Sequence, residues 1–534
     1  MIKIFFNYLK KNKFLLVVIF SFISLFLFLY KLTTVPPCLN ADETTNAYDA
    51  YSILKTGKDQ YGNFLPLRFK SFGDYKLPLL TYLTIPFIKI FGLNELGIRL
   101  VNLPFVFLYP LLIYFLINEF FNKKIVAFFG SFLISVNLGL FLIARQAHEG
   151  YLTTFFLSLT TLFFIKFLKR KNFFYFIFFN IAIFLSLFSY HFARLWFGFY
   201  FLIFVFLLIK KQINFKHLFI LIIVSGIFLI TDFIYQPTRV NNLLFFKSEG
   251  FKAKIKELKI ESRFPFLFNE ITIGGKQIIN SYLNYLSANF LVINGDANHR
   301  FGYPEMGPIT PIEYFLILIG LYYLFKNKEK WRYFILFLLL FSPISGSLTW
   351  ADKSITRTLF IFIPIIIISS YGGYNLFKNN QKIFYLGLLG FLFFLFYNWN
   401  FYLFHYPKRA TVIRSWQCGY KEMVDYVKEN YNKFNKFYIT KKNGQPYIYL
   451  LFYLKYSPEK YQKIAQLSPL DEYGFGQVNE FDKFYFELYP VEKNKKVALI
   501  GYPDDFENKI NKNFKEIKIN TETIFLIEEK LNNN

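Results

Sequence analysis

The stretch Pro36-Pro37-Cys38-Leu39-Asn40-Ala41-Asp42-Glu43 follows the first hydrophobic segment of the chain almost at once. We expect it where the chain leaves a bilayer, and its adjacent carboxylates open a long polar loop that reaches a second turn, Tyr75-Lys76-Leu77-Pro78. Loops of more than about 15 residues are uncommon in compact domains and are often functional. The stretch therefore predicts both the start of a membrane fold and a candidate site on it.

Composition supports a membrane fold. Of the 534 residues, 54% are hydrophobic and 23% are aromatic, which is too apolar for a soluble multidomain protein. The net charge of +26 comes from 61 Lys and Arg against 35 Asp and Glu. These cations recur in short clusters between apolar runs, as expected for cytoplasmic loops. The distribution argues against nucleic-acid binding.

Hydropathy predicts about eleven membrane spans. The chain begins with four lysines before the first apolar run, and no small-x-small cleavage site follows, so we expect an uncleaved first span with a cytoplasmic N-terminus. The segment 77–91 contains Pro78, Pro86 and Lys89 and is short, so we interpret it as an interfacial helix rather than a span. If 77–91 does not cross the membrane, every Lys/Arg cluster between spans falls on the cytoplasmic side and every long loop on the outer side. The expected spans are 14–30, 100–117, 125–143, 151–165, 173–189, 195–209, 218–234, 312–325, 333–346, 359–374 and 383–402.

Two domains are expected. Residues 1–406 form the transmembrane domain, with a first outer loop at 31–99 and a second at 235–311. Residues 407–534 form an extracytoplasmic α/β domain, because 421–431 has helical periodicity and 436–440, 496–501, 514–519 and 523–527 have strand composition. Cys38 and Cys418 both fall on the outer side; one bridge is an option, but two separate buried thiols are favoured.

Polar residues gather at the outer ends of the predicted spans: Asp42, Glu43, Asp74, Lys76, Arg145, His148, Glu149, Tyr190, His191, Arg194 and Arg357. A carboxylate base beside several cations suits transfer of a group from a phosphate carrier. Each residue also has an ordinary alternative. Asp42 could be a solvated turn residue or a helix N-cap, and Arg145 and Glu149 could pair at i,i+4. His191 could be an interfacial or hydrogen-bonded histidine, and Arg194 and Arg357 could reach lipid headgroups. Arg99, which opens a span, is interpreted as structural.

Together these motifs resemble the lipid-dependent glycosyltransferases of the GT-C fold, in particular the dolichyl-phosphate-mannose–protein mannosyltransferases and the bacterial aminoarabinose transferases. The likeness rests on Pro36–Glu43, on Gly73–Leu79, on Phe91–Leu100, on Tyr190–Arg194 and on Trp416–Tyr420. It covers most of the chain but is specific only in the first 100 residues.

The resemblance implies roles for individual residues. Asp42 would be the catalytic base with Glu43 as its companion, and Lys76 would bind the phosphate of a polyprenyl-phosphate sugar. Further substrate contacts would come from Asp74, Tyr75, Arg145, His148, Tyr190, His191, Arg194 and Arg357. The lysine turn departs from the family's Lys-Pro-Pro, and Tyr75 stands where aminoarabinose transferases have Glu, which puts their metal site in doubt here. The sequence requires no cofactor, although a divalent ion near Asp42 would suit its carboxylate.

The expected function is therefore a cell-membrane glycosyltransferase that moves a sugar, with inversion, from a polyprenyl-phosphate donor to a hydroxyl of a glycan, lipid or protein at the outer face. A transporter or lipid flippase is the first alternative, but such proteins place ionisable residues near the bilayer midplane and contain inverted repeats. A non-catalytic membrane scaffold is the second. The sequence identifies neither the sugar nor the acceptor.

Overall fold

The computed structural model describes residues 13–72, 74–235, 244–349, 353–470, 476–488, 495–506 and 513–530. It divides into two compact units. Unit 1 consists of Met1–Tyr30 and Asn102–Leu403, and unit 2 consists of Lys31–Val101 and Phe404–Asn534. Each unit therefore combines segments that lie far apart in the sequence.

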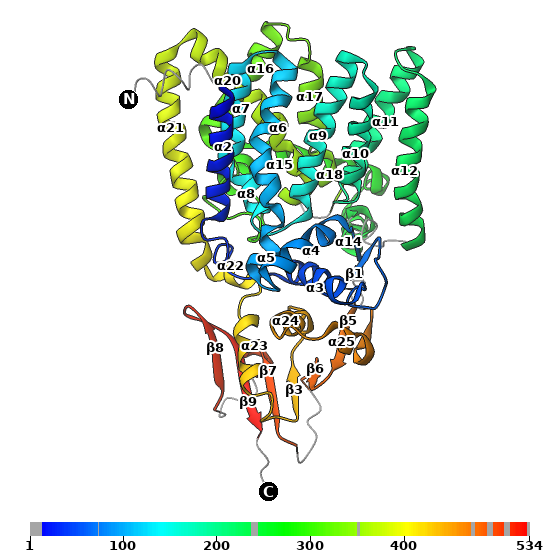
Figure 1. Ribbon diagram of the computed structural model, residues 1–534, viewed down its shortest axis with the longest axis vertical. Coiled ribbons are helices and arrows are strands. Elements are labelled where there is room, and N and C mark those ends of the chain that lie inside the picture. The colour runs from blue at the N-terminus through cyan, green and yellow to red at the C-terminus, as the bar shows by residue number, and fades with distance from the viewer. Residues whose placement is uncertain are drawn as a thin grey trace. The chain divides into compact units, whose positions relative to one another are not determined.

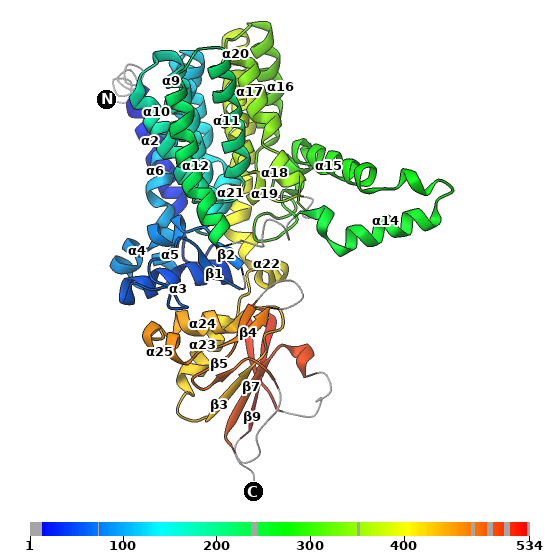
Figure 2. The same ribbon diagram turned by 90° about the vertical axis from the view of Figure 1, so that its right-hand side faces the viewer.

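Unit 1 is a bundle of apolar helices that run side by side (Figure 1). A shorter pair, α14 and α15, projects sideways from it (Figure 2). The helices of unit 1 are α2 (Lys13–Leu29), α6 (Leu103–Phe121), α7 (Lys124–Val136), α8 (Leu138–Ala144), α9 (Glu149–Arg170), α10 (Phe173–Leu187), α11 (Ala193–Ile209), α12 (Phe215–Tyr235), α14 (Glu249–Glu261), α15 (Glu270–Leu286), α16 (Pro311–Lys326), α17 (Arg332–Phe341), α18 (Ile344–Ser347), α19 (Ile355–Thr358), α20 (Phe362–Asn379) and α21 (Gln381–Asn400).

The bundle has the dimensions of a multi-pass membrane protein. Among the described residues, five helices are long and apolar enough to cross a bilayer, and a sixth span results if α7 and α8, which meet at a 49° bend, count as one. Several others, among them α2, α10 and α11, are apolar but shorter. Large side chains such as Phe233 and Leu229 point outward, as lipid-facing residues do. The count of eleven spans stays a prediction.

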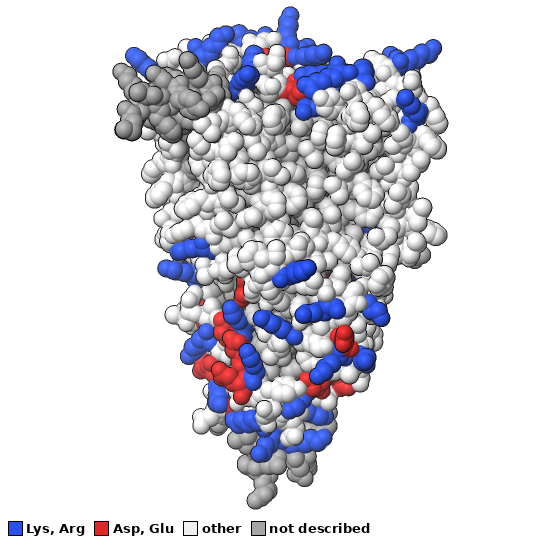
Figure 3. All heavy atoms as spheres, viewed as in Figure 1, with Lys and Arg blue, Asp and Glu red and all other residues white. Residues whose placement is uncertain are grey.

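Charged residues are unevenly distributed over unit 1. Lys and Arg gather at one end of the bundle, and the middle of the visible face is almost free of charge (Figure 3). The lysines and arginines that the sequence places between spans lie in the short connections α6–α7, α9–α10, α11–α12, α16–α17 and α20–α21. The connection from α12 to α16 lies at the other end of the bundle from these Lys/Arg-rich connections. It was predicted as a polar outer loop, and the structure places the helices α14 and α15 in it.

The first segment of unit 2 is also more regular than a loop. It contains α3 (Ala41–Thr56), the hairpin β1 (Phe69–Ser71) and β2 (Asp74–Lys76), α4 (Leu79–Phe91) and α5 (Glu95–Arg99). Helix α4 matches the helix predicted at 77–91. Helix α3 is unusual because its buried residues are largely polar, among them Thr44, Thr45 and Asn46. Hydropathy gives no signal for such a helix, because its buried face lacks the apolar periodicity on which prediction depends.

The second segment of unit 2 forms an α/β layer. Its sheet has the strand order β4-β5-β6-β3-β7-β9-β8, and β3 pairs in parallel with β6 and β7, whereas the other pairs are antiparallel. Tyr438, Val497, Leu499 and Phe506 form a core cluster. The elements are α22 (Ala410–Ser415), α23 (Tyr420–Glu429), β3 (Lys436–Ile439), α24 (Pro446–Tyr453), α25 (Pro458–Ile464), β4 (Gln466–Leu470), β5 (Gly476–Phe481), β6 (Phe484–Tyr485), β7 (Val497–Gly501), β8 (Lys515–Ile519) and β9 (Glu522–Lys530).

The helix and four strands expected in this segment are confirmed as α23, β3, β7, β8 and β9. No sequence pattern predicted α24 and α25 or β4 to β6. The preference for two separate thiols is wrong, because Cys38 and Cys418 form a disulfide across 380 residues of sequence. Loop closure over such a distance depends on the fold, which the spacing of two cysteines cannot reveal.

Candidate functional site

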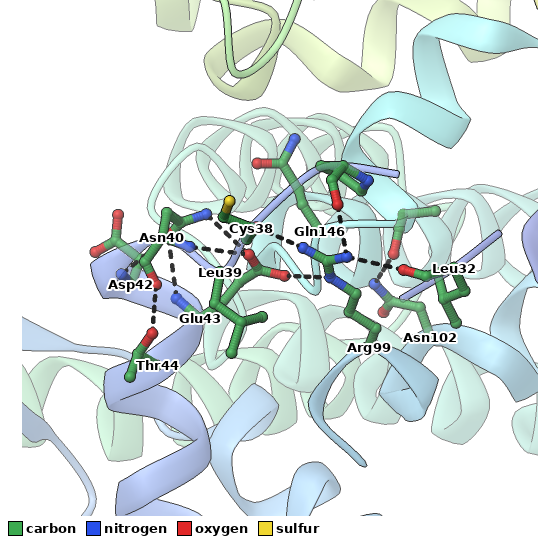
Figure 4. Close-up of polar contacts among 12 residues, drawn as sticks. Leu32, Cys38, Leu39, Asn40, Asp42, Glu43, Thr44, Arg99, Asn102 and Gln146 are labelled. Carbon is green, nitrogen blue, oxygen red and sulfur yellow. Dashed lines mark hydrogen bonds and ion pairs between the residues drawn. The ribbon is translucent and has the colours of Figure 1, made fainter. Parts of the chain in front are cut away.

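The two carboxylates of the opening stretch lie in the first turn of α3 but have different environments. Asn40 is the N-cap of the helix and accepts hydrogen bonds from the backbone N–H groups of Asp42 and Glu43. Glu43 completes a capping box by accepting from the Asn40 backbone N–H. Figure 4 shows the Asp42 and Glu43 side chains pointing away from each other. The alternative that Asp42 is the capping residue is therefore wrong.

Glu43 is buried against Arg99, and both side chains are almost inaccessible to solvent. The Arg99 Nε lies 3.2 Å from Glu43 Oε1. The remaining guanidinium nitrogens donate to the carbonyl oxygens of Leu32, Pro36 and Cys38 over 2.7–2.9 Å (Figure 4). Arg99 thus fixes the backbone that leads into α3, in agreement with its interpretation as structural. The negative charge of Glu43 offsets the desolvation cost of burying this arginine.

Asp42 is the accessible carboxylate. Its side chain is 43% exposed, and its Oδ1 lies 2.9 Å from the Nζ of Lys76, whose side chain is only 6% exposed. Lys76 Nζ also donates to the Asp42 carbonyl oxygen over 3.4 Å. The β1–β2 hairpin places Lys76 there, because it is the last residue of β2 and pairs with Phe69. A solvent-facing carboxylate is thus held beside a buried ammonium group.

The N-terminal end of α3 is held from the second segment of unit 2. Gln417 Oε1 accepts from the Ala41 backbone N–H over 3.1 Å and from the Tyr449 hydroxyl over 3.0 Å. Tyr449 also donates to the Leu39 carbonyl oxygen, and its ring stacks on that of Tyr420 at 4.2 Å. With the Cys38–Cys418 disulfide, these contacts explain the Trp416–Tyr420 motif: it holds the backbone on both sides of Asn40.

A second carboxylate lies two turns along α3 from Asp42. Asp49 is buried and accepts from the backbone and side-chain N–H groups of Gln60 over 3.0 and 3.1 Å. Burial, and then the nearby Asp59, raise the pKa of Asp49 well above its usual range, while the Gln60 hydrogen bonds and the charge of Lys76 oppose the shift. The Lys76 ammonium group therefore lies near two carboxylates, the exposed Asp42 and the buried Asp49. The sequence analysis missed Asp49, because only the helical spacing of seven residues could have indicated it.

In unit 1, the Arg145 predicted as a phosphate contact is engaged with the backbone. Its side chain is fully buried, and it donates to the carbonyl oxygens of Leu27, Phe28 and Tyr30 over 2.6–2.8 Å. These carbonyls lie at the C-terminal end of α2, where intrahelical donors run out. Arg145 therefore caps α2.

His148 lies at the start of α9. Its Nδ1 accepts from the Gly150 backbone N–H over 2.9 Å, so it caps the helix. Its ring lies edge-on to Tyr190 at 5.3 Å and to Phe301 at 5.7 Å. The structure thus brings together two of the predicted residues, His148 and Tyr190, from separate connections. His191 is adjacent, with its ring 5.9 Å from that of Tyr190.

Arg194 forms an ion pair with Asp232 that links α11 to α12, with 2.9 Å between its Nη2 and Asp232 Oδ2. This ion pair joins the two helices. Tyr75 is half-buried in β2, and the side chain of Asp74 lies outside the described part of the structure.

Arg357 belongs to a cluster that sequence analysis did not find. Asp296, in the α12–α16 connection, accepts from the Ile355 backbone N–H over 2.6 Å. Burial raises the pKa of Asp296 to about 7, against the opposing effects of hydrogen bonds from Asn298 and Ile355 and of the charges on Arg357 and Arg300. The only sequence signal was the polar run around Asp296, which also suits an ordinary turn.

A divalent ion near Asp42 was considered from the sequence because carboxylates suit hard cations. In the described ranges, no three His, Cys, Asp or Glu side chains converge in a way that could hold an ion. Hard divalent ions take six or more oxygen ligands, and substrate phosphates and waters often supply most of them. Asp42 could contribute one carboxylate to such a shell.

Comparison with known proteins gives similarities of fold only at low identity. No protein-family model matches the chain, and curated proteins give no match. Among solved structures, the chain is similar to the oligosaccharyltransferase AglB from Archaeoglobus fulgidus in complex with an inhibitory peptide and a dolichol-phosphate, at 14% identity and a TM-score of 0.47. The match covers 83% of this chain and 64% of AglB, so the chain spans less than two thirds of that relative.

The chain is also similar to ArnT from Cupriavidus metallidurans in the apo state, at 13% identity and a TM-score of 0.46, over 96% of this chain and 97% of ArnT. ArnT bound to undecaprenyl phosphate gives 13% identity and a TM-score of 0.43 over the same shares. Any chemistry assigned to this chain has to follow from its own contacts.

Proposed function

We propose that the chain is a membrane glycosyltransferase that transfers a sugar from a polyprenyl-phosphate donor to an acceptor hydroxyl. The observation that carries this proposal is the Asp42–Lys76 pair, in which an accessible carboxylate and a nearly buried ammonium group meet at the fixed start of α3. A transfer of this kind needs a base for the acceptor and a cation for the leaving phosphate. Asp42 is the candidate base and Lys76 the candidate cation, and their charged atoms lie 2.9 Å apart.

In the proposed reaction Asp42 accepts the proton of the acceptor hydroxyl, and the resulting oxygen nucleophile attacks the anomeric carbon. The bond between that carbon and the phosphate oxygen breaks, and its electron pair remains on the lipid phosphate. Lys76 stabilises that charge, as it stabilises the Asp42 carboxylate in the absence of donor. Direct displacement inverts the anomeric carbon. When the donor binds, Lys76 would pair with its phosphate instead of with Asp42. Asp42 would then be available to accept the proton of the acceptor.

We further propose that unit 2 lies on the extracytoplasmic side and that the N-terminus is cytoplasmic. The Lys/Arg-rich connections of unit 1 support this orientation through the positive-inside rule. The Cys38–Cys418 disulfide supports it independently, because disulfides persist in oxidising compartments.

Transfer from a panel of labelled polyprenyl-phosphate sugars, measured in membranes that carry each variant, tests the chemistry. Asp42→Asn keeps the shape of the side chain but removes the base, and we expect transfer to fall roughly 10²–10⁴-fold. Lys76→Ala should reduce both transfer and binding of the unlabelled lipid phosphate. Asp425→Asn, an exposed position on α23, is the matched control and should retain full transfer.

Wild-type transfer that survives Asp42→Asn would refute the base assignment. If no sugar of the panel is transferred, lipid-phosphate binding that is lost in Lys76→Ala and retained in the control still supports the donor class. Binding that is equal in all variants would contradict it.

A further inference from the structure

The helical arm formed by α14 and α15, residues 249–286, is folded but largely unsupported by the bundle. Its two helices pack on each other through a small core of Phe245, Phe251 and Ile255, with Ile273 and Ile278 against it. Ser248 and Asn269 cap the two helices. Figure 2 shows the arm projecting sideways from the helices of unit 1. The arm is therefore an ordered feature with a large free surface.

Large apolar side chains cover its outer end. Exposed fractions are 76% for Ile260, 54% for Phe264, 73% for Phe266, 50% for Leu267 and 85% for Ile271. We call these five residues the apolar tip. Contiguous exposed apolar surface of this kind marks a contact with a partner or a membrane rather than with water.

The apolar surface continues along α15 but not along α14. Ile279 and Leu283 of α15 are 61% and 59% exposed and follow Ile271 at intervals of eight and four residues, so the three share one helix face. The exposed residues of α14 are instead mainly charged: Lys252, Lys254, Lys256 and Lys259 together with Glu249, Glu257 and Glu261. The arm is thus amphipathic as a whole, with one apolar and one charged helix.

The position of the arm matches this division. It belongs to the α12–α16 connection, at the end of the bundle opposite the Lys/Arg-rich connections. In Figure 2, α15 lies nearer the middle of the bundle and α14 nearer its end. With the bundle spanning a bilayer, this order would put the apolar helix on the hydrocarbon side and the charged helix on the aqueous side.

We propose that the α14–α15 arm lies in the bilayer interface, with the apolar tip and the outer face of α15 among the acyl chains and the lysines of α14 at anionic headgroups. Interfacial helices with a basic and an apolar face bind membranes in this way. Residues 247–276 carry seven Lys or Arg against four Glu. This positive excess complements anionic lipid, which favours a lipid leaflet over a second copy of the same arm. The proposal does not depend on the transferase reaction.

Environment-sensitive labels on single added cysteines test this placement in the full-length protein. In the described part of the chain both native cysteines are in the disulfide, so a maleimide dye should report the added position. Phe266→Cys and Ile271→Cys sample the apolar side, and Lys254→Cys on α14 is the matched control. Each variant is placed, one chain per disc, in nanodiscs of phosphatidylcholine and phosphatidylglycerol, with or without brominated acyl chains.

We expect blue-shifted emission and quenching by brominated lipid at positions 266 and 271, and quenching by aqueous iodide at position 254. Quenching of all three by iodide, with no effect of brominated lipid, would overturn the proposal. Protection of positions 266 and 271 from both quenchers would also overturn it, because a protein surface would then cover the tip. A thermal unfolding midpoint equal to that of the wild type would show that each variant is folded.

Discussion

Two buried arginines close to the first membrane exit illustrate how the two units use charge differently. Arg145 in unit 1 donates to three carbonyl oxygens at the end of α2. Arg99 in unit 2 donates to three carbonyl oxygens of the chain entering α3 and also pairs with Glu43. The five-donor guanidinium fork suits both tasks. In unit 2 the neighbouring Asp42 is left accessible, so the arginine supports a site, whereas in unit 1 it supports a helix end.

The same contrast applies to the other cations that sequence placed at outer span ends. Arg194 joins two helices through Asp232, and Lys76 meets a carboxylate that is open to solvent. A common side of the membrane therefore did not imply a common role. Accessibility of the partner, rather than the presence of a charge, separates structural from candidate catalytic residues.

The largest expected effect is the loss of Arg99. Arg99→Ala would leave Glu43 buried without its cation and would remove the donors to three carbonyls, and we expect unit 2 to lose about 3–5 kcal/mol of stability. Thermal unfolding followed through the unit 2 tyrosines measures this loss. Adding Glu43→Gln should recover part of it, because the stranded charge disappears. If the double variant is less stable than Arg99→Ala, the uncompensated charge of Glu43 does not cause the loss of stability. Arg99 would then act, as Arg145 does, only through its carbonyl contacts.

An intermediate effect is expected at Gln417. Gln417→Ala removes the acceptor for Ala41 and Tyr449 and should cost about 1 kcal/mol of stability. By loosening the start of α3 it should also lower kcat more than it raises KM for the donor, because Asp42 would be less well oriented for proton transfer.

Gln417→Glu keeps the accepting oxygen and is the conservative control, so it should restore kcat. Equal losses in Gln417→Ala and Gln417→Glu, or a change in KM alone, would show that this contact does not orient Asp42.

The smallest effect concerns pH and Asp49. Because the folded pKa of Asp49 is raised by burial and by Asp59, the folded protein holds this proton more tightly than the unfolded chain does. Its contribution to stability is present below the unfolded pKa of about 3.9 and declines as pH rises toward the folded pKa. Asp49→Asn removes this decline.

The stability of Asp49→Asn relative to the wild type should therefore increase as pH rises from about 4. Unfolding midpoints measured across this pH range provide the test. A constant difference between Asp49→Asn and the wild type would mean that Asp49 is charged in both states.

The sequence by itself determined the membrane class, the clustering of Lys and Arg in short connections between apolar helices and the existence of the C-terminal sheet, because hydropathy, charge and strand composition are local properties. It also directed attention to Asp42 and Lys76, since both stand in short motifs. Helix α3 escaped prediction because it is stabilised by buried polar contacts that carry no periodic signal. The Cys38–Cys418 disulfide, the Gln417 contact with Ala41, the Asp296–Ile355 contact and the amphipathic arm were decided only by tertiary structure. Each depends on segments that meet through folding, and no local pattern encodes which distant partner a buried polar group will find.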